Sequence, residues 1–292
     1  MRTIILGNFD GVHLGHQALL RRARDVSAGD EVVAVTFETH PVGITRGEVP
    51  AQLTSALERE RLLIAGGVRR VESLQVSEDL LRQTPHEFIE ALAARLPFSN
   101  IVEGADFRFG CNRSGSVETL RQLGHQLGFQ TVIVDEVDVT LHDGQVAAAR
   151  SSMVRWLLAR GRVADARVML GRSHYVSGVV VEGARRGRQL GFPTANIAAC
   201  DAVLPANGVY EVSVTDVDGT HWQGAASVGT NPTFGSCPRT LEVHMPTLPF
   251  ESNLYGHVMR VSFTRWIREM IRFDSVETLV AQIARDCAKV VA

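Results

Sequence analysis

Two histidines, His13 and His16, stand near the start of the chain, after a glycine-bearing loop. The β-branched run 3–6 predicts a strand, and apolar residues at helical spacing over 16–26 predict a helix. The histidines therefore fall at a helix N-terminus, where unpaired N–H groups and a partial positive charge suit a phosphate. Residues three apart share one helical face, so both imidazoles could hydrogen-bond the phosphate oxygens that gain charge when an α-phosphorus is attacked.

The same segment carries Gly11 and Gly15, which let a backbone approach a nucleotide closely. A simpler interpretation is a pair of surface histidines beside a turn. A lone His-x-x-His pattern would favour that interpretation, but here the histidines follow a strand and an Asn-Phe-Asp-Gly loop. The longer pattern favours nucleotidyl transfer at the α-phosphate of a nucleoside triphosphate.

Residues 7–17 (GNFDGVHLGHQ) resemble the opening of the bacterial bifunctional riboflavin kinase/FAD synthetase family. Three further segments resemble that family in the same order, residues 36–41 (TFETHP), 104–115 (GADFRFGCNRSG) and 150–155 (RSSMVR). The resemblance implies attack of the FMN phosphate on the α-phosphorus of MgATP, which gives FAD and pyrophosphate. A phosphate anion needs little activation by a base, so positioning and charge neutralisation would carry the reaction, and no covalent nucleophile is expected.

The resemblance also implies the residues of this first site. His13, His16 and Arg155 would be catalytic and hold the ATP phosphates. The other nucleotide-binding residues would be Gly7, Asn8, Phe9, Asp10, Gly11, Gly15, Ser151 and Ser152, and the flavin-binding residues His40, Asp106 and Phe107.

Two residues of these segments depart from the family pattern. Thr39 stands where the family has a proline, which is a mild change because His40 and Pro41 follow unaltered. Arg150 stands where the family has a serine. A cation at this position could strengthen phosphate binding, alter nucleotide choice, or point into water.

A second candidate site lies in residues 183–196 (GARRGRQLGFPTAN). A glycine-bearing loop with basic side chains suits a polyphosphate, and Thr194 and Asn196 offer oxygens for Mg²⁺. A solvated basic turn would explain the arginines alone, but PTAN resembles the centre of the riboflavin kinase signature. That resemblance places Gly183, Arg188, Thr194 and Asn196 at ATP, with Thr194 and Asn196 as the metal ligands.

Two later segments complete the resemblance to a riboflavin kinase. Residues 241–244 match the family's LEVH, which makes Glu242 the candidate general base for the ribityl 5′-hydroxyl, with His244 as its support. Residues 268–273 (REMIRF) resemble its RxExKF, which places Arg268 at the flavin.

This half of the chain departs from the family more than the first half does. Asn231 replaces an arginine, and the stretch 245–253 is longer than expected and lacks an Asp-Phe pair. Met270 stands where a glutamate is expected, unless an offset of one residue places Glu269 there. Because these changes fall in segments that would shape the flavin pocket, adenylylation is better supported than the kinase reaction, and an altered flavin is conceivable.

Strands and helices alternate through the first half of the chain, which is typical of a parallel sheet covered on both faces. The predicted strands are 3–6, 31–37, 70–74, 100–103 and 131–134, and the predicted helices are 16–26, 55–65, 85–96, 116–127, 151–159 and 163–170. From residue 175 onward, short β-rich runs separated by Gly, Pro, Asn and Asp predict an antiparallel barrel or sandwich, followed by a helix over 276–290. The sequence thus predicts a doubly wound α/β nucleotidyltransferase domain over residues 1–170. The resemblance adds a small antiparallel β-barrel, riboflavin kinase-like, over residues 171–292.

Composition narrows the partners. The 292 residues carry a formal net charge of −2 and no long block of like charges, which disfavours nucleic acid as a partner. The opening apolar run is too short for a signal peptide, and no run of about 18 apolar residues occurs, so we expect a cytoplasmic protein without a membrane partner. The cysteines, Cys111, Cys200, Cys237 and Cys287, form no Cys-x-x-Cys pair and are expected to be structural. The sequence leaves the oligomeric state open.

Three hypotheses follow. The first is a bifunctional enzyme that makes FMN from riboflavin and FAD from FMN, with ATP as substrate and Mg²⁺ as cofactor at two sites. The second keeps only adenylylation, of FMN, a modified flavin or another nucleotide, beside a degenerate kinase domain. The third is a non-catalytic flavin or nucleotide sensor, which has no need of a proton acceptor such as Glu242.

Overall fold

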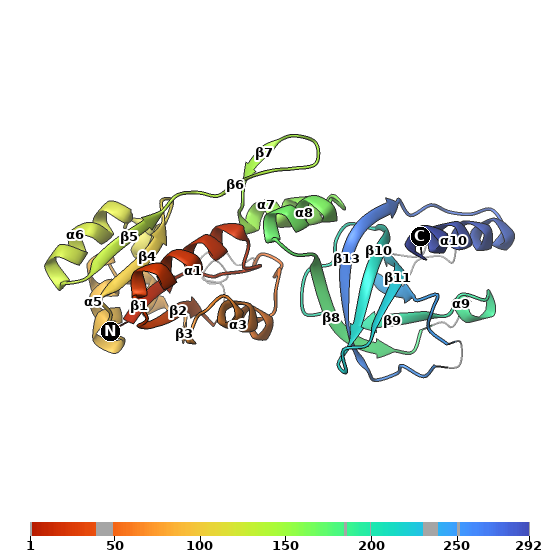
Figure 1. Ribbon diagram of the computed structural model, residues 1–292, viewed down its shortest axis with the longest axis horizontal. Helices are drawn as coiled ribbons and strands as arrows, with labels where there is room; N and C mark the ends of the chain where they lie inside the picture. Colours follow the sequence, from red (N-terminus) through yellow and green to blue (C-terminus); the bar gives the residue numbers. More distant parts are fainter. Residues whose placement is uncertain are drawn as a thin grey trace. The chain divides into compact units, whose positions relative to one another are not determined.

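The computed structural model describes residues 2–38, 49–183, 186–198, 200–229, 239–249 and 252–291. The chain divides into two compact units (Figure 1). The first comprises Met1–Ala51, Ser55–Val139 and Val146–Ser151, and the second comprises Gln52–Thr54, Thr140–Gln145 and Ser152–Ala292. The domain boundary at Leu170 stays a prediction.

The elements follow one another in a simple order. Up to residue 148 they are β1 (Arg2–Leu6), α1 (Leu14–Ser27), β2 (Glu31–Phe37), α3 (Ala56–Ala65), β3 (Arg70–Leu74), α4 (Glu78–Arg82), α5 (Pro85–Arg95), β4 (Asn100–Gly104), the 3₁₀ turn η1 (Cys111–Arg113), α6 (Val117–Leu127), β5 (Gln130–Val134), β6 (Asp138–Thr140) and β7 (Val146–Ala148). From residue 151 they are α7 (Ser151–Leu158), α8 (Val163–Leu170), β8 (His174–Val181), α9 (Arg186–Gln189), β9 (Thr194–Ala198), β10 (Gly208–Asp216), β11 (His221–Gly229), β12 (Thr240–His244), β13 (Val258–Arg268) and α10 (Val276–Val291).

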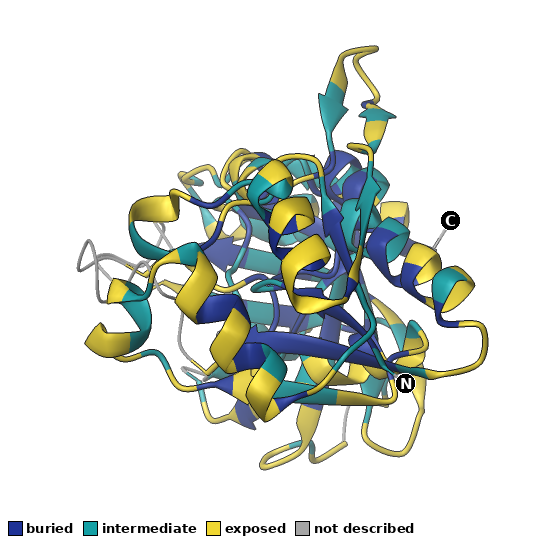
Figure 2. Ribbon diagram, turned by 90° about the vertical axis from the view of Figure 1, so that its left-hand side faces the viewer, coloured by how far each residue is buried: buried dark blue, intermediate teal, exposed yellow. Residues whose placement is uncertain are grey.

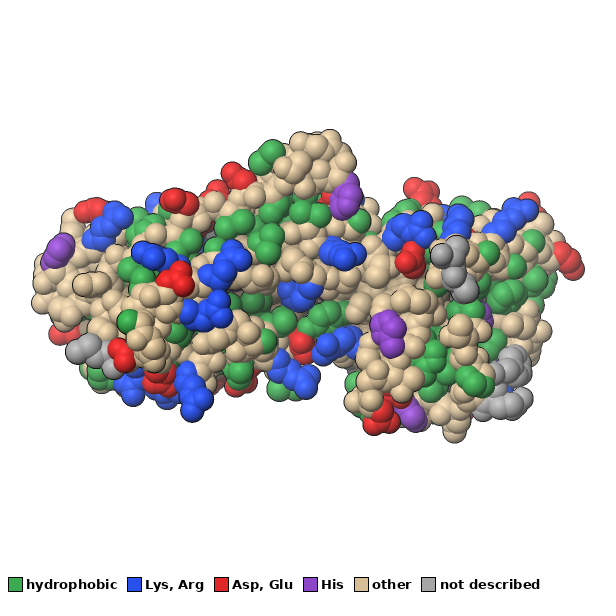
Figure 3. All heavy atoms as spheres, in the orientation of Figure 1, with side chains coloured by type: hydrophobic (Ala, Val, Ile, Leu, Met, Phe, Trp, Pro, Cys, Tyr) green, Lys and Arg blue, Asp and Glu red, His purple; other side chains and the backbone are tan. Residues whose placement is uncertain are grey.

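The first unit contains a parallel sheet in the order β3-β2-β1-β4-β5, which confirms the predicted α/β class. β1 and β2 each contain a continuous apolar run, residues 4–6 and 32–35, as is typical of strands in a sheet covered on both faces. Figure 2 shows these strands in dark blue, with helices that turn yellow sides outward. Charged side chains of both signs lie on the outer surface of each unit (Figure 3).

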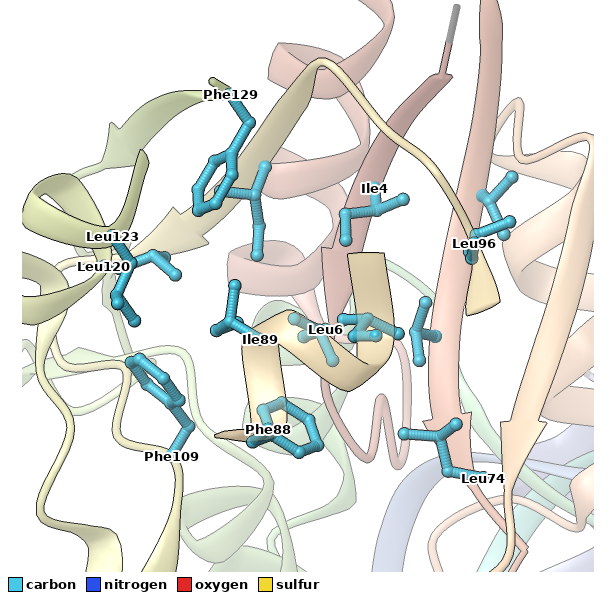
Figure 4. Close-up of a cluster of buried hydrophobic side chains, with 14 residues drawn as sticks. Ile4, Leu6, Leu74, Phe88, Ile89, Leu96, Phe109, Leu120, Leu123 and Phe129 are labelled. Carbon is cyan, nitrogen blue, oxygen red and sulfur yellow. The ribbon is translucent and has the colours of Figure 1, made fainter. Parts of the chain in front are cut away.

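Successive side chains of a strand point to opposite faces, so β1 supplies both cores. Ile4 and Leu6 pack with Phe88 and Ile89 of α5 and with Leu120 of α6 (Figure 4). The opposite face buries a second cluster, made by α1 and α3 against the sheet and consisting mainly of Ile5, Leu19, Leu20, Val32 and Leu63.

The order of the sheet places β1 between β2 and β4, which is where the direction of chain winding reverses. Ligands of open α/β sheets bind in the crevice at the carboxyl ends of the strands at such a reversal. The segment with His13 follows β1, and the segment with Asp106 follows β4, so both leave the sheet at this edge.

The second unit contains a closed antiparallel barrel in the order β10-β11-β12-β9-β8-β13, which decides between the predicted barrel and sandwich. Along β8 the side chains alternate between the interior, as at Val176 and Val180, and the outside, as at Val179. Closure leaves no free strand edge. The helix α10 packs against β10 and β11.

The β-rich runs predicted from residue 175 onward are 176–181, 208–214, 222–228, 241–244 and 257–263. They omit β9, whose short Thr-Ala-Asn-Ile-Ala run carries little β signal. Tertiary pairing nevertheless makes it a strand, with β12 on one side and β8 on the other. Cys111, Cys200 and Cys287 carry free thiols, and Cys237 lies outside the described residues. None of the helices in the described ranges is long and apolar enough to cross a bilayer.

Candidate active sites

His13 and His16 lie at the start of α1. His13 is the N-cap residue, with φ −69° and ψ 174°, and His16 lies in the first turn. Their rings stack with centroids 3.6 Å apart and planes 27° apart, which confirms the predicted shared face. A Cβ on Gly15 would come within 3.1 Å of the His13 ring and 3.0 Å of the Ala149 carbonyl oxygen. Gly15 therefore makes room for the His13 ring.

Burial controls the charge of His16. The Phe9 ring, itself only 1% exposed, packs edge-on against it at 5.2 Å. Burial, with a smaller effect from His13, holds the pKa of His16 well below its usual value. Its Nδ1 is buried and has no hydrogen-bond partner among the described residues. A neutral imidazole of this kind can donate one N–H bond to a phosphate oxygen without an added charge.

The backbone between β1 and α1 is tightly wound. Gly11 has φ +83°, and Phe9 and Val12 have φ +48° and +39°, which is an uncommon region for residues with side chains. The Gln17 side chain donates to the Val12 carbonyl oxygen at 3.0 Å. The Ser151 hydroxyl donates to the backbone oxygen of the buried Asp10 at 2.7 Å. Ser151 thus holds the predicted phosphate loop.

Arg59 on α3 is a residue near this site that the sequence analysis did not identify. It is half-buried and donates to the Phe37 carbonyl oxygen at 3.5 Å. Burial lowers its pKa, and the charge of Asp10 acts in the opposite direction, which places the two groups near each other. Arg59 is one of several charged residues in an ordinary helical pattern, so nothing in the sequence marks it.

The sequence alone left open that the Arg150 side chain simply points into water. The side chain instead contacts two carboxylates. Its guanidinium group is hydrogen-bonded to the Glu136 carboxylate and lies 3.4 Å from Asp106 Oδ2. The two carboxylates already balance its charge, so phosphate binding and nucleotide choice gain no support from it. Its contact with Asp106 joins the segment after β4 to the segment before α7.

The remaining residues predicted for the first site lie on several different elements. The Phe107 ring stacks on Phe109 at 5.3 Å and packs partly into the core. Gly7 and Asn8 are half-buried directly after β1. Ser152 and Arg155 lie on α7, which clusters with the second unit, and their role stays a prediction. His40 lies outside the described residues, as does Thr39.

The second site is assembled by strand pairing in the barrel. β9 and β12 are antiparallel, with Asn196 opposite Glu242 and Thr194 opposite His244. The Thr194 hydroxyl donates to Glu242 Oε2 at 3.4 Å. Residues 46 and 48 positions apart in the sequence therefore bring an amide and a hydroxyl next to a carboxylate.

Gly183 leaves space for the side chain of Asn196. A Cβ at this position would lie 2.3 Å from Asn196 Nδ2. Only glycine leaves space for the Asn196 amide in its present place. His244 does not bond to Glu242, because its Nδ1 lies 2.8 Å from the Pro193 carbonyl oxygen, and it holds the segment just before Thr194.

Two cavities meet at these residues. The larger, of about 680 Å³, is lined by Glu242, Arg239 and Arg268 together with many apolar side chains. The smaller, of about 280 Å³, is lined by Arg188, Pro193 and residues of the 245–253 stretch. Gly183, Thr194 and Asn196 line both.

The lining of the larger cavity shows which residue stands where the family has a glutamate, near the end of β13. Met270 lines it, accepting a hydrogen bond from the Ser227 hydroxyl at 3.4 Å, whereas Glu269 is exposed and does not line it. The expected glutamate is therefore replaced by a thioether. Arg268 is bound to the buried Asp286 at 2.8 Å.

Asp286 and Arg239 are cavity residues that the sequence analysis missed. Asp286 lies in the amphipathic helix α10, and Arg239 donates to Asn207 Oδ1 at 2.8 Å. Neither belongs to a recognisable motif. Asn231, the other departure, lies outside the described residues.

Two family models match the chain, one described as FAD synthetase over residues 2–149 and one described as riboflavin kinase over residues 170–292. The bifunctional riboflavin kinase/FMN adenylyltransferase of Escherichia coli strain K12 is 36% identical over 288 residues, which cover 97% of this chain and 90% of that protein. The protein of the same description from Pseudomonas fluorescens is 38% identical over 289 residues, with the same coverage of 97% and 90%. A crystal structure described as a macrolide-efflux protein from Streptococcus pneumoniae is 31% identical, with a TM-score of 0.87 over 99% of this chain and 93% of that one.

Proposed function

The chain belongs to the family of bifunctional riboflavin kinase/FMN adenylyltransferases, and from this premise we propose that it converts riboflavin to FMN and FMN to FAD, using ATP at two separate sites. The observation that carries the proposal is the agreement between two matched family models and two built sites, one in each model's range.

In the first unit, we assign adenylylation to the start of α1. An oxygen of the FMN phosphate forms a bond to the α-phosphorus of ATP, the bond to the bridging oxygen breaks, and its electron pair leaves with pyrophosphate. The stacked imidazoles of His13 and His16 lie at a helix start, where N–H donors can stabilise the charge that develops on the phosphate oxygens during this attack. FMN is already an anion, so no side chain has to remove a proton from it. Arg155 is assigned to the same phosphates.

In the second unit, we assign the kinase reaction to the junction of the two cavities. Glu242 removes the proton of the ribityl 5′-hydroxyl, whose oxygen forms a bond to the γ-phosphorus of ATP while ADP leaves. An alcohol needs such a base, in contrast to FMN. The position of Glu242 beside Thr194, on the wall of the larger cavity, supports this role.

The cavities fit the two substrates of the kinase. We place the flavin in the larger cavity, whose apolar lining suits an aromatic ring system, with Arg268 at its rim. We place ATP in the smaller cavity, where Arg188 and Gly183 accompany the Pro-Thr-Ala-Asn segment. The shared residues Thr194 and Asn196 then stand between the γ-phosphate and the hydroxyl.

The donor set at this junction fits Mg²⁺. Thr194 supplies a hydroxyl oxygen and Asn196 supplies an amide oxygen. The missing side chain at Gly183 leaves the space that the Asn196 amide occupies. Within the residues that the structure describes, no group of three or more His, Cys, Asp or Glu side chains is arranged to hold a metal. Mg²⁺ is commonly held by few protein ligands together with substrate phosphates, so these two oxygens suffice as its protein share. When bound, it would neutralise charge on the β- and γ-phosphates. The use of ATP at both sites supports a cytoplasmic location.

One observation favours a second candidate function. Met270 lines the larger cavity where the family resemblance predicts a carboxylate. A protein that adenylylates FMN but no longer phosphorylates riboflavin would be compatible with that change.

Purified full-length chain should be incubated with MgATP and either riboflavin or FMN, and the flavins separated by chromatography. We expect FMN and FAD from riboflavin, and FAD from FMN. Formation of FAD from FMN without FMN from riboflavin would favour the second candidate. Flavin or ATP binding without any turnover would favour the sensor.

A further inference from the structure

A buried carboxyl group lies at the carboxyl edge of the parallel sheet, and neither proposed reaction uses it. Glu103 stands next to the end of β4 and is only 1% exposed. Its Oε1 accepts a hydrogen bond from the backbone N–H of Leu6, the last residue of β1, at 2.6 Å. Leu6 directly precedes the segment that carries His13, and Glu103 lies just before the segment that carries Asp106. Both segments leave the sheet toward the candidate adenylyltransferase site.

The pairing of β1 with its two neighbours ends at different points. With β2 it extends to Leu6 opposite Val35, and Gly7 N donates to the Val35 oxygen at 3.0 Å. With β4 it is formed at Thr3–Asn100 and Ile4–Ile101. Continued in the same register, Leu6 would lie opposite Glu103, but its N–H binds the Glu103 side chain in place of a backbone carbonyl. The carboxyl group therefore takes over the ladder position where β1 and β4 part.

From this relationship we propose that Glu103 is a positioning residue of the adenylyltransferase site, which anchors Leu6 and so fixes the segment 7–13 over the crevice between β1 and β4. The inference rests on the proposed adenylylation of FMN. It assigns to Glu103 no contact with substrate. Through Leu6 the residue sets the path of the backbone that ends at His13.

The protonation state of Glu103 follows from its surroundings. Burial raises the pKa of Glu103 well above its usual value; the hydrogen bond from Leu6 opposes this shift, and the negative charge of Asp106 adds to it. Titratable groups in the segments that leave this edge of the sheet include Asp10, His13 and His16 after β1 and Asp135 and Glu136 after β5. Two cations accompany these carboxylates, since Arg150 is paired with Asp106 and Glu136, and Arg59 lies near Asp10. α5 and α6 present apolar residues to this face of the sheet.

A neutral carboxyl group suits a site that binds polyanions. An ionised Glu103 would place a negative charge beneath the phosphates of ATP and FMN, in addition to that of Asp106. It would also draw water to a buried position. Loss of its proton as the pH rises should therefore weaken FAD synthesis.

Two variants separate anchoring from simple packing. Glu103→Gln keeps the carbonyl acceptor for Leu6 and cannot ionise. Glu103→Leu keeps the volume and the apolar packing but leaves the Leu6 N–H without its acceptor. Glu118→Gln, an exposed residue of α6, is the matched control.

FAD synthesis from FMN and MgATP should be measured for all four proteins between pH 6 and pH 10. We expect Glu103→Gln to stay within about threefold of wild type at pH 7, and Glu103→Leu to lose on the order of 100-fold in kcat/KM through misplacement of the loop. Wild type and Glu118→Gln should lose activity as the pH rises and Glu103 ionises, while Glu103→Gln should not. Riboflavin phosphorylation should be equal in all four.

Backbone amide exchange of Leu6 gives a readout that needs no catalysis. We expect protection in wild type and Glu103→Gln and loss of protection in Glu103→Leu. Wild-type activity in Glu103→Leu, or an unchanged alkaline loss in Glu103→Gln, would overturn the inference. Absence of FAD synthesis in wild type would instead refute the proposed function, and the exchange experiment would still decide whether Glu103 anchors Leu6.

Discussion

Thr194 and Glu242 contact each other across the β9–β12 pair, with the threonine hydroxyl 3.4 Å from the carboxylate. Thr194 is the proposed metal ligand and Glu242 the proposed base. Their contact means that the oxygen to be deprotonated and the phosphate to be transferred can be held within one small region. The barrel achieves this with strand pairing rather than with a mobile loop.

Replacement of Glu242 by glutamine should abolish the kinase reaction selectively. The amide keeps the shape but cannot accept the ribityl proton, so riboflavin phosphorylation should fall by about 10²–10⁴-fold. FAD formation from added FMN should be unchanged, because that reaction needs no such base. The matched control is Glu269→Gln, at the exposed neighbour of Met270. Equal loss of both reactions in Glu242→Gln would contradict independent sites.

Gly183→Ala should displace the Asn196 amide, since the added Cβ would lie 2.3 Å from Asn196 Nδ2. Misplacement of a ligand by about 1 Å can cost on the order of 100-fold in rate, so kinase activity should fall steeply and the requirement for Mg²⁺ should rise. Gly219→Ala is the control, because Gly219 has open space around it, and its φ of +82° adds a backbone strain that Gly183 does not have. Kinetics with varied Mg²⁺ test the prediction, and a variant indistinguishable from Gly219→Ala would disprove it.

His13→Ala should lower FAD synthesis by about 10²–10³-fold, the usual cost of removing one donor to a developing oxyanion. The kinase reaction should be spared. His125→Ala, at an exposed position of α6, should leave both reactions intact. A fully active His13→Ala enzyme would refute the phosphate-binding role.

The half-buried imidazole of His16, with its inaccessible Nδ1, should make stability depend on pH. Its pKa is lowered in the folded chain, mainly by burial, so below about pH 6.5 the unfolded chain binds a proton that the folded chain does not. This contribution to stability is complete above that pH and is lost as the pH falls toward the folded-state pKa. The melting temperature of His16→Asn should therefore fall less between pH 7 and pH 5 than that of wild type. Parallel curves for wild type, His16→Asn and the exposed control His125→Asn would show that His16 does not contribute.

Local patterns in the sequence determined much of this protein. The alternation of apolar runs and helical spacing specified the parallel sheet, because secondary structure follows the periodicity of neighbouring side chains. The two histidines at a helix start needed only local geometry to be brought together, since a helix places residues three apart on one face. Segments such as Pro-Thr-Ala-Asn and Leu-Glu-Val-His indicated the chemistry without indicating that they would meet.

Only the tertiary structure decided the relationships that span the chain. Long-range packing decides the pairing of Asn196 with Glu242 and the ion pairs of Arg150. It also decides that Met270 lines the cavity and Glu269 does not. The contact of Glu103 with Leu6 is of the same kind, since it joins residues 97 positions apart. A buried glutamate in a short strand looks like an unfavourable choice in the sequence. Its reason becomes visible only where two strands part and one backbone N–H requires an acceptor.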